Sequence, residues 1–222
     1  MRLGVVTGLP MEARVLQPYL SEQLIVCVAG LIPGAAARAA EQLIGAGVTA
    51  LMSFGLAGGL DPAAACGSAV VASEVRGDIW LATDGIWRAR LAELVGAEFF
   101  GAIADTPVVL VNPDLKAFAY EKTAAAAADM ESYAVAEVAA KAHMPFAALR
   151  VIADTANDVV PPIALKAVSA DGRPLIGKAI LGALMNPTQI PDLIRLGQRT
   201  SVAMKKLEML ARLGAPTAFG LT

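Results

Sequence analysis

The amino-acid sequence predicts an α/β fold with three layers, in which strands form the middle layer and helices cover both sides. Three observations support this prediction. Short apolar segments of strand length alternate with longer segments of helical periodicity. The alternation runs through the chain without a recognisable linker or internal repeat. Hydrophobic residues make up 56% of the 222 residues, enough for a sizeable core, and single α/β domains reach roughly 200–250 residues. We therefore expect one domain over residues 1–222.

Three compact apolar segments near the start of the chain are expected to form strands, over residues 2–7, 24–29 and 50–54. Pro10 suits the first position of a helix, because its φ is already helical and its missing N–H needs no partner there. A helix is therefore expected from about residue 11, and an alanine-rich helix follows the second strand. The third strand leads into the glycine-rich segment 55–62, where the backbone can approach a ligand without an intervening Cβ.

The middle of the chain continues the alternation. Strands are expected over residues 68–74, 78–82, 99–103, 107–111 and 146–153, and helices over residues 86–95, 113–123 and 129–142. Asp129 is expected to be the N-cap of the last of these helices, because Val135 and Val138 continue an apolar helical face after it. In the strand over 146–153, alternation places Arg150 and Asp154 on the same side as its apolar neighbours.

The last part of the chain is expected to be helical, over residues 163–169, 175–185 and 190–213. The third of these helices has an amphipathic face that includes Leu193, Leu196, Met204, Leu207 and Leu210. This pattern predicts that the helix packs against the sheet.

Composition excludes several classes of function. The net charge is -2 and basic residues do not cluster, so a nucleic-acid partner is not expected. Cys27 and Cys66 lack metal or redox spacing, which fits a reducing cytoplasm. The uncharged stretch 42–60 contains five glycines and is read as a helix end, a strand and a loop rather than a transmembrane helix. The alanine-rich composition favours subunit contacts, and a homo-oligomer is expected.

Charged residues stand out where elements end. Glu12 follows the first strand, at the edge where open α/β sheets bind ligands, although it could simply complement the helix dipole by about 0.3–1 kcal/mol. Arg150 lies in an apolar strand and requires a carboxylate partner there. Asp154 at the end of that strand is either a cap or a site residue, and its spacing alone does not decide. His143, the one histidine, precedes Pro145 at a helix end, which argues against Ser-His or Cys-His hydrolysis.

Four segments in a fixed order resemble a known superfamily. They are Glu12 after the first strand, SFGLAGGL at 53–60, DMES at 129–132 and RVIADTA at 150–156. Together they resemble the purine nucleoside phosphorylase and methylthioadenosine nucleosidase superfamily, and EARVL at 12–16 makes the chain most similar to its hopanoid-associated branch. The resemblance implies a phosphorylase/hydrolase-like fold with a central mixed sheet flanked by helices. It also implies cleavage of the N-ribosidic bond of a 5′-substituted adenosine such as adenosylhopane, with release of adenine.

The resemblance assigns roles that suit this chemistry. Such a bond breaks through a ribosyl cation with a purine as leaving group, so the site must protonate the base and stabilise positive charge on the sugar. Asp154 matches the aspartate that protonates the purine at N7. Glu131 matches the glutamate that binds the ribose hydroxyls, and Met130 matches the methionine under the sugar.

The remaining matches concern the nucleophile. Glu12 matches the carboxylate that orients and deprotonates the attacking water, and Arg150 would hold the nucleophile or pair with the acidic residues. Ala57 and Gly58 match the backbone loop beside sugar and base. No metal or organic cofactor is implied, although inorganic phosphate remains a candidate co-substrate. A small-molecule nucleoside is the expected partner, and a lipid-linked one would bring this cytoplasmic protein to the inner membrane surface.

Some positions depart from the superfamily pattern. Leu56 and Ser53 stand where relatives carry a phosphate-binding serine and arginine, which favours water as the nucleophile unless Arg14 or Arg150 compensates. Lys116 and Phe118 are candidates for stacking on the base. A channel for an apolar 5′ substituent would be lined by Leu9, Leu56 and residues 181–185, which ordinary core packing explains equally well.

Overall fold

Eight strands form one mixed sheet in the computed structural model, which describes residues 1–166, 168–173, 175 and 185–221. Their bounds are β1 Leu3–Thr7, β2 Leu24–Val28, β3 Ala50–Gly59, β4 Ala69–Arg76, β5 Trp80–Ala82, β6 Phe99–Asp105, β7 Ala127–Asp129 and β8 Phe146–Asp154. Strands β2, β1, β3 and β8 are mutually parallel, whereas β4 runs antiparallel to β8. The expected mixed sheet is therefore confirmed.

Five of these strands close a ring of pairings. β3 pairs with β8, β8 with β4, β4 with β6, β6 with β7, and β7 returns to β3. Because β1, β3 and β8 are parallel, their carboxyl ends meet at one edge of the sheet. β7 joins the same edge, since Ala128 pairs with Gly58 near the end of β3. Chain segments that are distant in sequence therefore meet at this edge.

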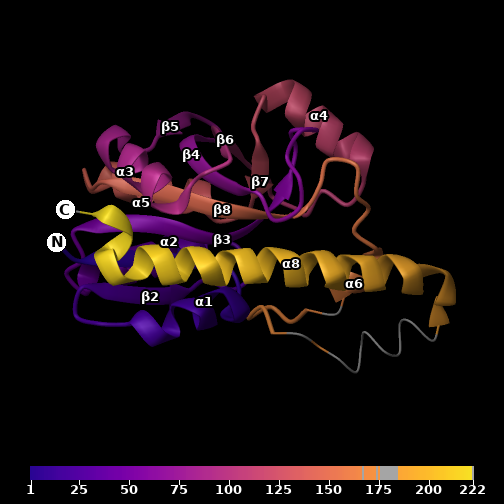
Figure 1. Cartoon of the computed structure of the whole chain (residues 1–222), viewed down its shortest axis with the longest axis horizontal. Helices are drawn as coiled ribbons and strands as arrows, with labels where there is room; N and C mark the ends of the chain where they lie inside the picture. Colours follow the sequence, from indigo (N-terminus) through magenta and orange to yellow (C-terminus); the bar gives the residue numbers. More distant parts are fainter. Residues whose placement is uncertain (167, 174, 176–184, 222) are drawn as a thin grey trace.

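Helices cover both faces of the sheet (Figure 1). Their bounds are α1 Pro10–Leu16, α2 Ala35–Gly45, α3 Gly85–Val95, α4 Pro113–Thr123, α5 Ser132–Lys141, α6 Pro162–Lys166 and α8 Ile190–Gly214. Short 3-10 helices cover Gln17–Tyr19, Pro187–Gln189 and Ala215–Gly220. Within the described residues, no helix is both long and apolar enough to cross a membrane.

Two buried clusters separate the layers. On one face, residues of α1, α3 and α8 share a cluster with alternate residues of the central strands, such as Met52 and Leu149. The long helix α8 runs along this face (Figure 1), and its Leu207 and Leu210 are fully buried. On the other face, α2 and α5 share a cluster with Leu51 and the neighbouring strand residues. The expected three-layer arrangement is confirmed, and the apolar face of the last helix packs as predicted.

Helix α4 lies at the end of the sheet beside β6 and β7 (Figure 1). Asn112 is its N-cap and accepts a hydrogen bond from the backbone N–H of Leu115 at 2.9 Å, and Pro113 occupies the first helical position. This start directs one side chain of the first turns, Lys116, into the interior, where it is 1% exposed.

Several expected boundaries are wrong. The segment 107–111 forms no strand: Pro107 offers no N–H to a ladder, and Val108 and Val109 are 60% and 41% exposed. The third strand continues to Gly59, because the glycine-rich segment pairs with both β8 and β7. Asp129 is not the N-cap of α5, since it ends β7 and Glu131 takes the cap position.

The C-terminal expectations have mixed outcomes. Helix α6 ends at Lys166, earlier than residue 169. The helix expected over 175–185 lies almost entirely outside the described residues. The uncharged stretch 42–60 forms the end of α2 followed by β3, as expected.

Candidate active site

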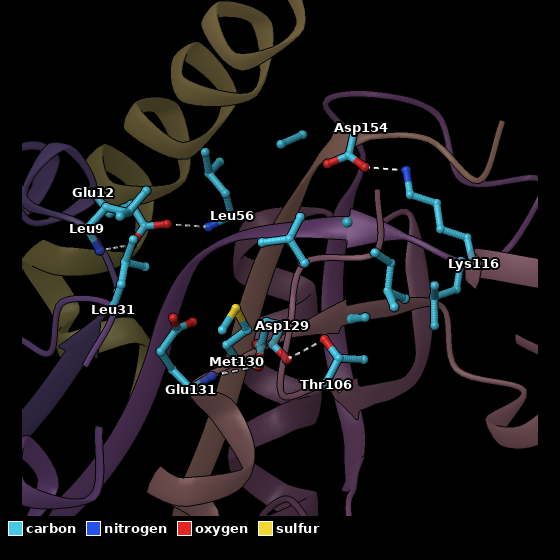
Figure 2. A pocket seen from close by; sticks show the side chains of 18 residues that line it. Leu9, Glu12, Leu31, Leu56, Thr106, Lys116, Asp129, Met130, Glu131 and Asp154 are labelled. Atoms are coloured by element: carbon cyan, nitrogen blue, oxygen red, sulfur yellow. Dashed lines mark hydrogen bonds and ion pairs between the residues drawn. The ribbon is translucent and has the colours of Figure 1, made fainter. Parts of the chain in front are cut away.

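A cavity of about 250 Å³ lies at the edge of the sheet where β1, β3 and β8 end. Segments after β6 and β7 and the inner side of α4 complete its wall (Figure 2). Most lining side chains are apolar. The charged residues of the wall are Glu12, Lys116, Asp129, Glu131 and Asp154.

Glu12 reaches the cavity from the first turn of α1 and is 2% exposed. Its Oε2 accepts a hydrogen bond from the backbone N–H of Leu9 at 2.8 Å, and its Oε1 accepts one from the N–H of Leu56 at 2.8 Å. Burial raises the pKa of the Glu12 carboxyl, against the opposing effects of Arg150 and the backbone N–H groups. A helix-dipole role alone does not explain the bond to Leu56, which ties the carboxylate to β3 and aims it at the cavity.

Gly55 makes room for this carboxylate. A Cβ at Gly55 would lie 2.6 Å from Glu12 Oε1 and 2.6 Å from a terminal nitrogen of Arg150. Glu12 and Arg150 therefore approach each other over a backbone position that only glycine can occupy without displacement.

Glu131 enters the cavity from the turn between β7 and α5. Its carboxylate lies against Gly8, where a Cβ would be 2.8 Å from Oε1. Burial raises the pKa of Glu131 to about 7, and the negative charges of Asp129 and Glu12 add to this effect, although Arg150 opposes it. Met130, the preceding residue, also lines the cavity and is 36% exposed. Glu131 therefore titrates near neutral pH, beside an apolar thioether.

Arg150 lies beneath the cavity floor and is 0% exposed. Its Nε lies 2.6 Å from Asp129 Oδ2, and a terminal nitrogen lies 3.4 Å from Glu131 Oε2. The same guanidinium donates to the hydroxyls of Ser53 at 2.6 Å and Ser132 at 3.1 Å. The carboxylate partner expected from sequence is thus present, and two serines complete the buried network.

At the other end of the cavity, Asp154 ends β8 and meets Lys116 of α4 (Figure 2). The ammonium of Lys116 donates to Asp154 Oδ2, to the carbonyl of Thr155 at 2.6 Å and to that of Asp158 at 3.2 Å. Burial raises the pKa of Asp154, and Lys116 opposes this shift. The Asp154 carboxyl is therefore partly buried and held by the ammonium group of Lys116.

The structure brings most of the residues expected from sequence to this one cavity. Those that line it are Glu12, Ala57, Gly58, Met130, Glu131 and Asp154, while Arg150 lies directly beneath. Leu9 and Leu56 also line it, as the proposed apolar channel requires.

Other expected residues lie elsewhere. The sequence left open whether Arg14 or Arg150 could bind phosphate. Arg14 is exposed and does not line the cavity, and Arg150 binds Ser53 and Asp129. Phe118 is 59% exposed and does not line the cavity. Residues 181–184 of the expected channel are outside the described residues, and Met185 is 74% exposed.

Sequence reasoning missed the partner of Asp154. Lys116 stood out only as a candidate for stacking on the base, whereas its ammonium binds the carboxylate. Lys116 lies close to the start of a helix that Pro113 marks, and a lysine at such a position is ordinarily exposed to solvent. The local sequence therefore gave no indication that Lys116 is buried. Ser132 donates a hydrogen bond to the hydroxyl of Ser53, and the sequence did point to Ser132, because it belongs to the DMES segment at 129–132.

Comparisons with known proteins agree with this architecture. The model of the phosphorylase superfamily matches residues 99–172, about one third of the chain. No curated protein matches the chain in sequence. The 5′-methylthioadenosine/S-adenosylhomocysteine nucleosidase from Neisseria meningitidis, solved with methylthio-immucillin-A, is 16% identical with a TM-score of 0.72, and the match covers 99% of each chain.

Two further solved structures are similar. The corresponding nucleosidase from Colwellia psychrerythraea, solved with adenine, is 18% identical with a TM-score of 0.71, covering 97% of this chain and 95% of that chain. Futalosine hydrolase of Helicobacter pylori is 15% identical with a TM-score of 0.68, covering 96% and 97%. The chain therefore has the fold of these nucleosidases, and together with the family match this supports the phosphorylase superfamily.

Proposed function

We propose that this chain is a nucleosidase that hydrolyses the N-ribosidic bond of a 5′-substituted adenosine and releases adenine. The observation that supports this most strongly is the meeting of three carboxyl groups from distant segments in one cavity, one of them buried and two partly buried. Glu12 comes from α1, Glu131 from the turn after β7 and Asp154 from the end of β8. The match to the phosphorylase superfamily and the fold shared with nucleosidases point to the same class of enzyme.

In the proposed reaction, the purine lies at the Asp154 end of the cavity and the ribose near Glu131 and Met130. The bond between C1′ and N9 breaks, its electron pair passes to the purine, and Asp154 donates a proton to N7. Water adds to C1′ and gives its proton to Glu12. The raised pKa values of Asp154 and Glu12 suit an acid that must be protonated and a base that must accept a proton near neutral pH. The products are adenine and a 5-substituted ribose, and no cofactor is required.

Charge favours water over phosphate as the nucleophile. Within the described lining, Lys116 is the single cationic side chain, whereas the same lining contains four carboxyl groups. Arg150, the other buried cation nearby, already binds Asp129, Glu131 and two serines. A phosphate dianion would meet several like charges without a free cationic partner, which is unfavourable in a partly dry site.

The 5′ substituent is proposed to be large and apolar, with adenosylhopane as the substrate. Leu31, Val109 and Met130 line the cavity yet remain 40%, 41% and 36% exposed, so the cavity opens past an apolar rim. The resemblance to the hopanoid-associated branch supports the same substrate. With a lipid-linked substrate, the protein would work in the cytoplasm against a membrane surface. The proposal also keeps the single domain and the homo-oligomer that the sequence predicts.

An adenine-release assay tests this proposal. Adenosine, methylthioadenosine, S-adenosylhomocysteine and adenosylhopane are compared, each with and without inorganic phosphate, and the sugar product is identified. We expect release without phosphate, with ribose rather than ribose 1-phosphate as the sugar moiety, and the highest kcat/KM on adenosylhopane. A strict requirement for phosphate would make the protein a phosphorylase. Preference for a small 5′ substituent would overturn the assignment of adenosylhopane.

A variant connects the assay to the site. Asp154→Asn removes the acid proton while keeping the shape, and should abolish adenine release with an unchanged circular dichroism spectrum. Asp114→Asn, on the exposed first turn of the same helix that carries Lys116, is the matched control and should retain activity. Undiminished turnover by Asp154→Asn, or tight nucleoside binding by the native protein without any release, would exclude the proposed chemistry.

A further inference from the structure

We propose that Lys116 is a positioning residue that fixes the acid proton of Asp154 on the one carboxyl oxygen that faces the purine. This inference rests on the proposed function, because it concerns how the same site delivers a proton to N7. It adds a residue of α4 that none of the sequence motifs contains.

The first step is the commitment of the lysine. An ammonium group has three N–H donors and no acceptor. The acceptors of Lys116 are Asp154 Oδ2, the Thr155 carbonyl at 2.6 Å and the Asp158 carbonyl at 3.2 Å. All three donors are therefore used within the protein. Lys116 cannot donate to the base without breaking a buried bond, so it acts through Asp154 rather than on the substrate.

The second step concerns the two oxygens of Asp154. Because Oδ2 accepts a hydrogen from the ammonium, a proton on the neutral carboxyl group is placed on Oδ1. In Figure 2 the other carboxyl oxygen points away from Lys116. A Cβ at Gly58 would be 3.5 Å from Oδ2 and 3.7 Å from Oδ1, so the glycine backbone leaves the carboxyl group accessible to a ligand. The lysine thus selects which oxygen is the donor.

The third step is electrostatic. When Asp154 gives its proton to N7, a negative charge develops on the carboxylate next to a buried ammonium, and their attraction is strongest at that stage. Burial without the lysine would hold the proton more tightly and make Asp154 a weaker acid. The other charged groups facing Asp154 are Asp158 and Arg199, which pair with each other at 2.7 Å. Lys116 is therefore the cation that offsets the burial of Asp154.

The test compares Lys116→Met with Lys116→Arg in the full-length chain, using Lys122→Met on the exposed side of the same helix as the control. In Lys116→Met the alkaline limb of the pH profile of kcat/KM should move to higher pH, because the opposite charge that lowers the pKa of Asp154 is gone. Lys116→Arg should restore the limb of the native protein. Lys122→Met should leave the whole profile unchanged.

A second substrate separates this role from a purely structural one. The leaving group of 4-nitrophenyl riboside departs as a stable phenolate and needs no proton. Lys116→Met should therefore lose about 10–100-fold in adenine release, within the range of general acid catalysis, while cleavage of the nitrophenyl riboside stays within about threefold.

Two results would overturn the inference: equal losses on both substrates, or a pH limb that does not move. Both are measured against a native enzyme that releases adenine. If the native protein itself releases no adenine, the proposed function fails instead, so the two failures are distinguishable.

Discussion

Arg150 and Asp129 form an ion pair that is closed to solvent on both sides. The Nε of Arg150 lies 2.6 Å from Asp129 Oδ2, and the two side chains are 0% and 2% exposed. Asp129 also accepts hydrogen bonds from the backbone N–H groups of Glu131 at 3.1 Å and Ser132 at 2.9 Å. The pair therefore fixes the turn that presents Glu131 to the cavity, so stability and site geometry depend on the same contact.

Replacing Arg150 by Met should lower the free energy of unfolding by about 3–5 kcal/mol, because Asp129 is left as a buried charge without its partner. Urea denaturation measures the loss. The double variant Arg150→Met with Asp129→Asn should lose less than the sum of the two single variants, since the second change removes the unpaired charge. The matched control is Arg195→Met, which breaks an exposed pair with Asp192 and should change stability by about 1 kcal/mol or less. A native-like midpoint for Arg150→Met would contradict this account.

Gly55→Ala should impair both stability and catalysis, because the new Cβ would stand 2.6 Å from Glu12 Oε1 and from the Arg150 guanidinium. Overpacking of this kind costs about 1–3 kcal/mol. The displaced Glu12 should also lower kcat in the adenine-release assay. Gly45→Ala, where a Cβ meets no atom within 4 Å, is the control and should be neutral or slightly stabilising in its helix. Equal behaviour of the two variants would show that the close approach at Gly55 has no consequence.

The sequence predicted the layers well because their signals are local. The apolar strands and the alternation in β8 determine which side chains enter which buried cluster, and this needs no knowledge of distant residues. The failures lie where tertiary contacts decide. The segment 107–111 has strand composition but forms part of the cavity wall through Val109 and Leu110, and the glycines of β3 continue the strand because β7 and β8 pair with them.

The candidate site could be predicted in part. Glu12, Glu131 and Asp154 were found because each is a carboxylate at the end of an element, in an order that resembles a known superfamily. Their convergence on one cavity depends on the pairing of β3 with β1, β7 and β8, which the sequence does not reveal. The Lys116 contact could not be predicted, because it joins the first turns of α4 to the end of β8 across 38 positions.

Glu12→Gln should reduce kcat for adenine release by about 10²–10⁴-fold, because the amide cannot take a proton from the attacking water. KM should change little, since the amide keeps the volume of the side chain. Its single oxygen accepts from one of the backbone N–H groups of Leu9 and Leu56, and the other N–H loses its acceptor. Steady-state kinetics at several pH values measures both constants. Glu22→Gln, an exposed glutamate, is the control. A kcat within about threefold of the native value would exclude Glu12 as the base.

Glu131 should make stability depend on pH in the direction opposite to that of an ordinary salt-bridged carboxylate. The pKa of Glu131 is about 7 in the folded chain, whereas its ordinary value, taken for the unfolded chain, is 4.5. The folded state therefore binds the proton more tightly than the unfolded state. The free energy of unfolding should therefore fall as pH rises from 4.5 to 7, by at most about 3 kcal/mol. Below pH 4.5 both states are protonated, and above pH 7 both are ionised, so the contribution is constant outside this window.

Glu131→Gln isolates this contribution, because the amide does not titrate and other carboxyl groups with raised pKa values affect both proteins alike. Urea denaturation at pH 5, 6, 7 and 8 should show the variant gaining stability relative to the native protein up to pH 7 and no further. Asp105→Asn is the comparison: burial raises the pKa of Asp105 to about 6, so its effect should be complete at a lower pH. Parallel curves for native protein and Glu131→Gln would mean that the carboxyl is not desolvated in solution. In that case Glu131 would already be ionised well below neutral pH, and the KM for the nucleoside would stay constant on acidification from pH 7 to 6. With a pKa of about 7, by contrast, the KM should rise over this range, because only the ionised carboxylate accepts hydrogen bonds from both ribose hydroxyls.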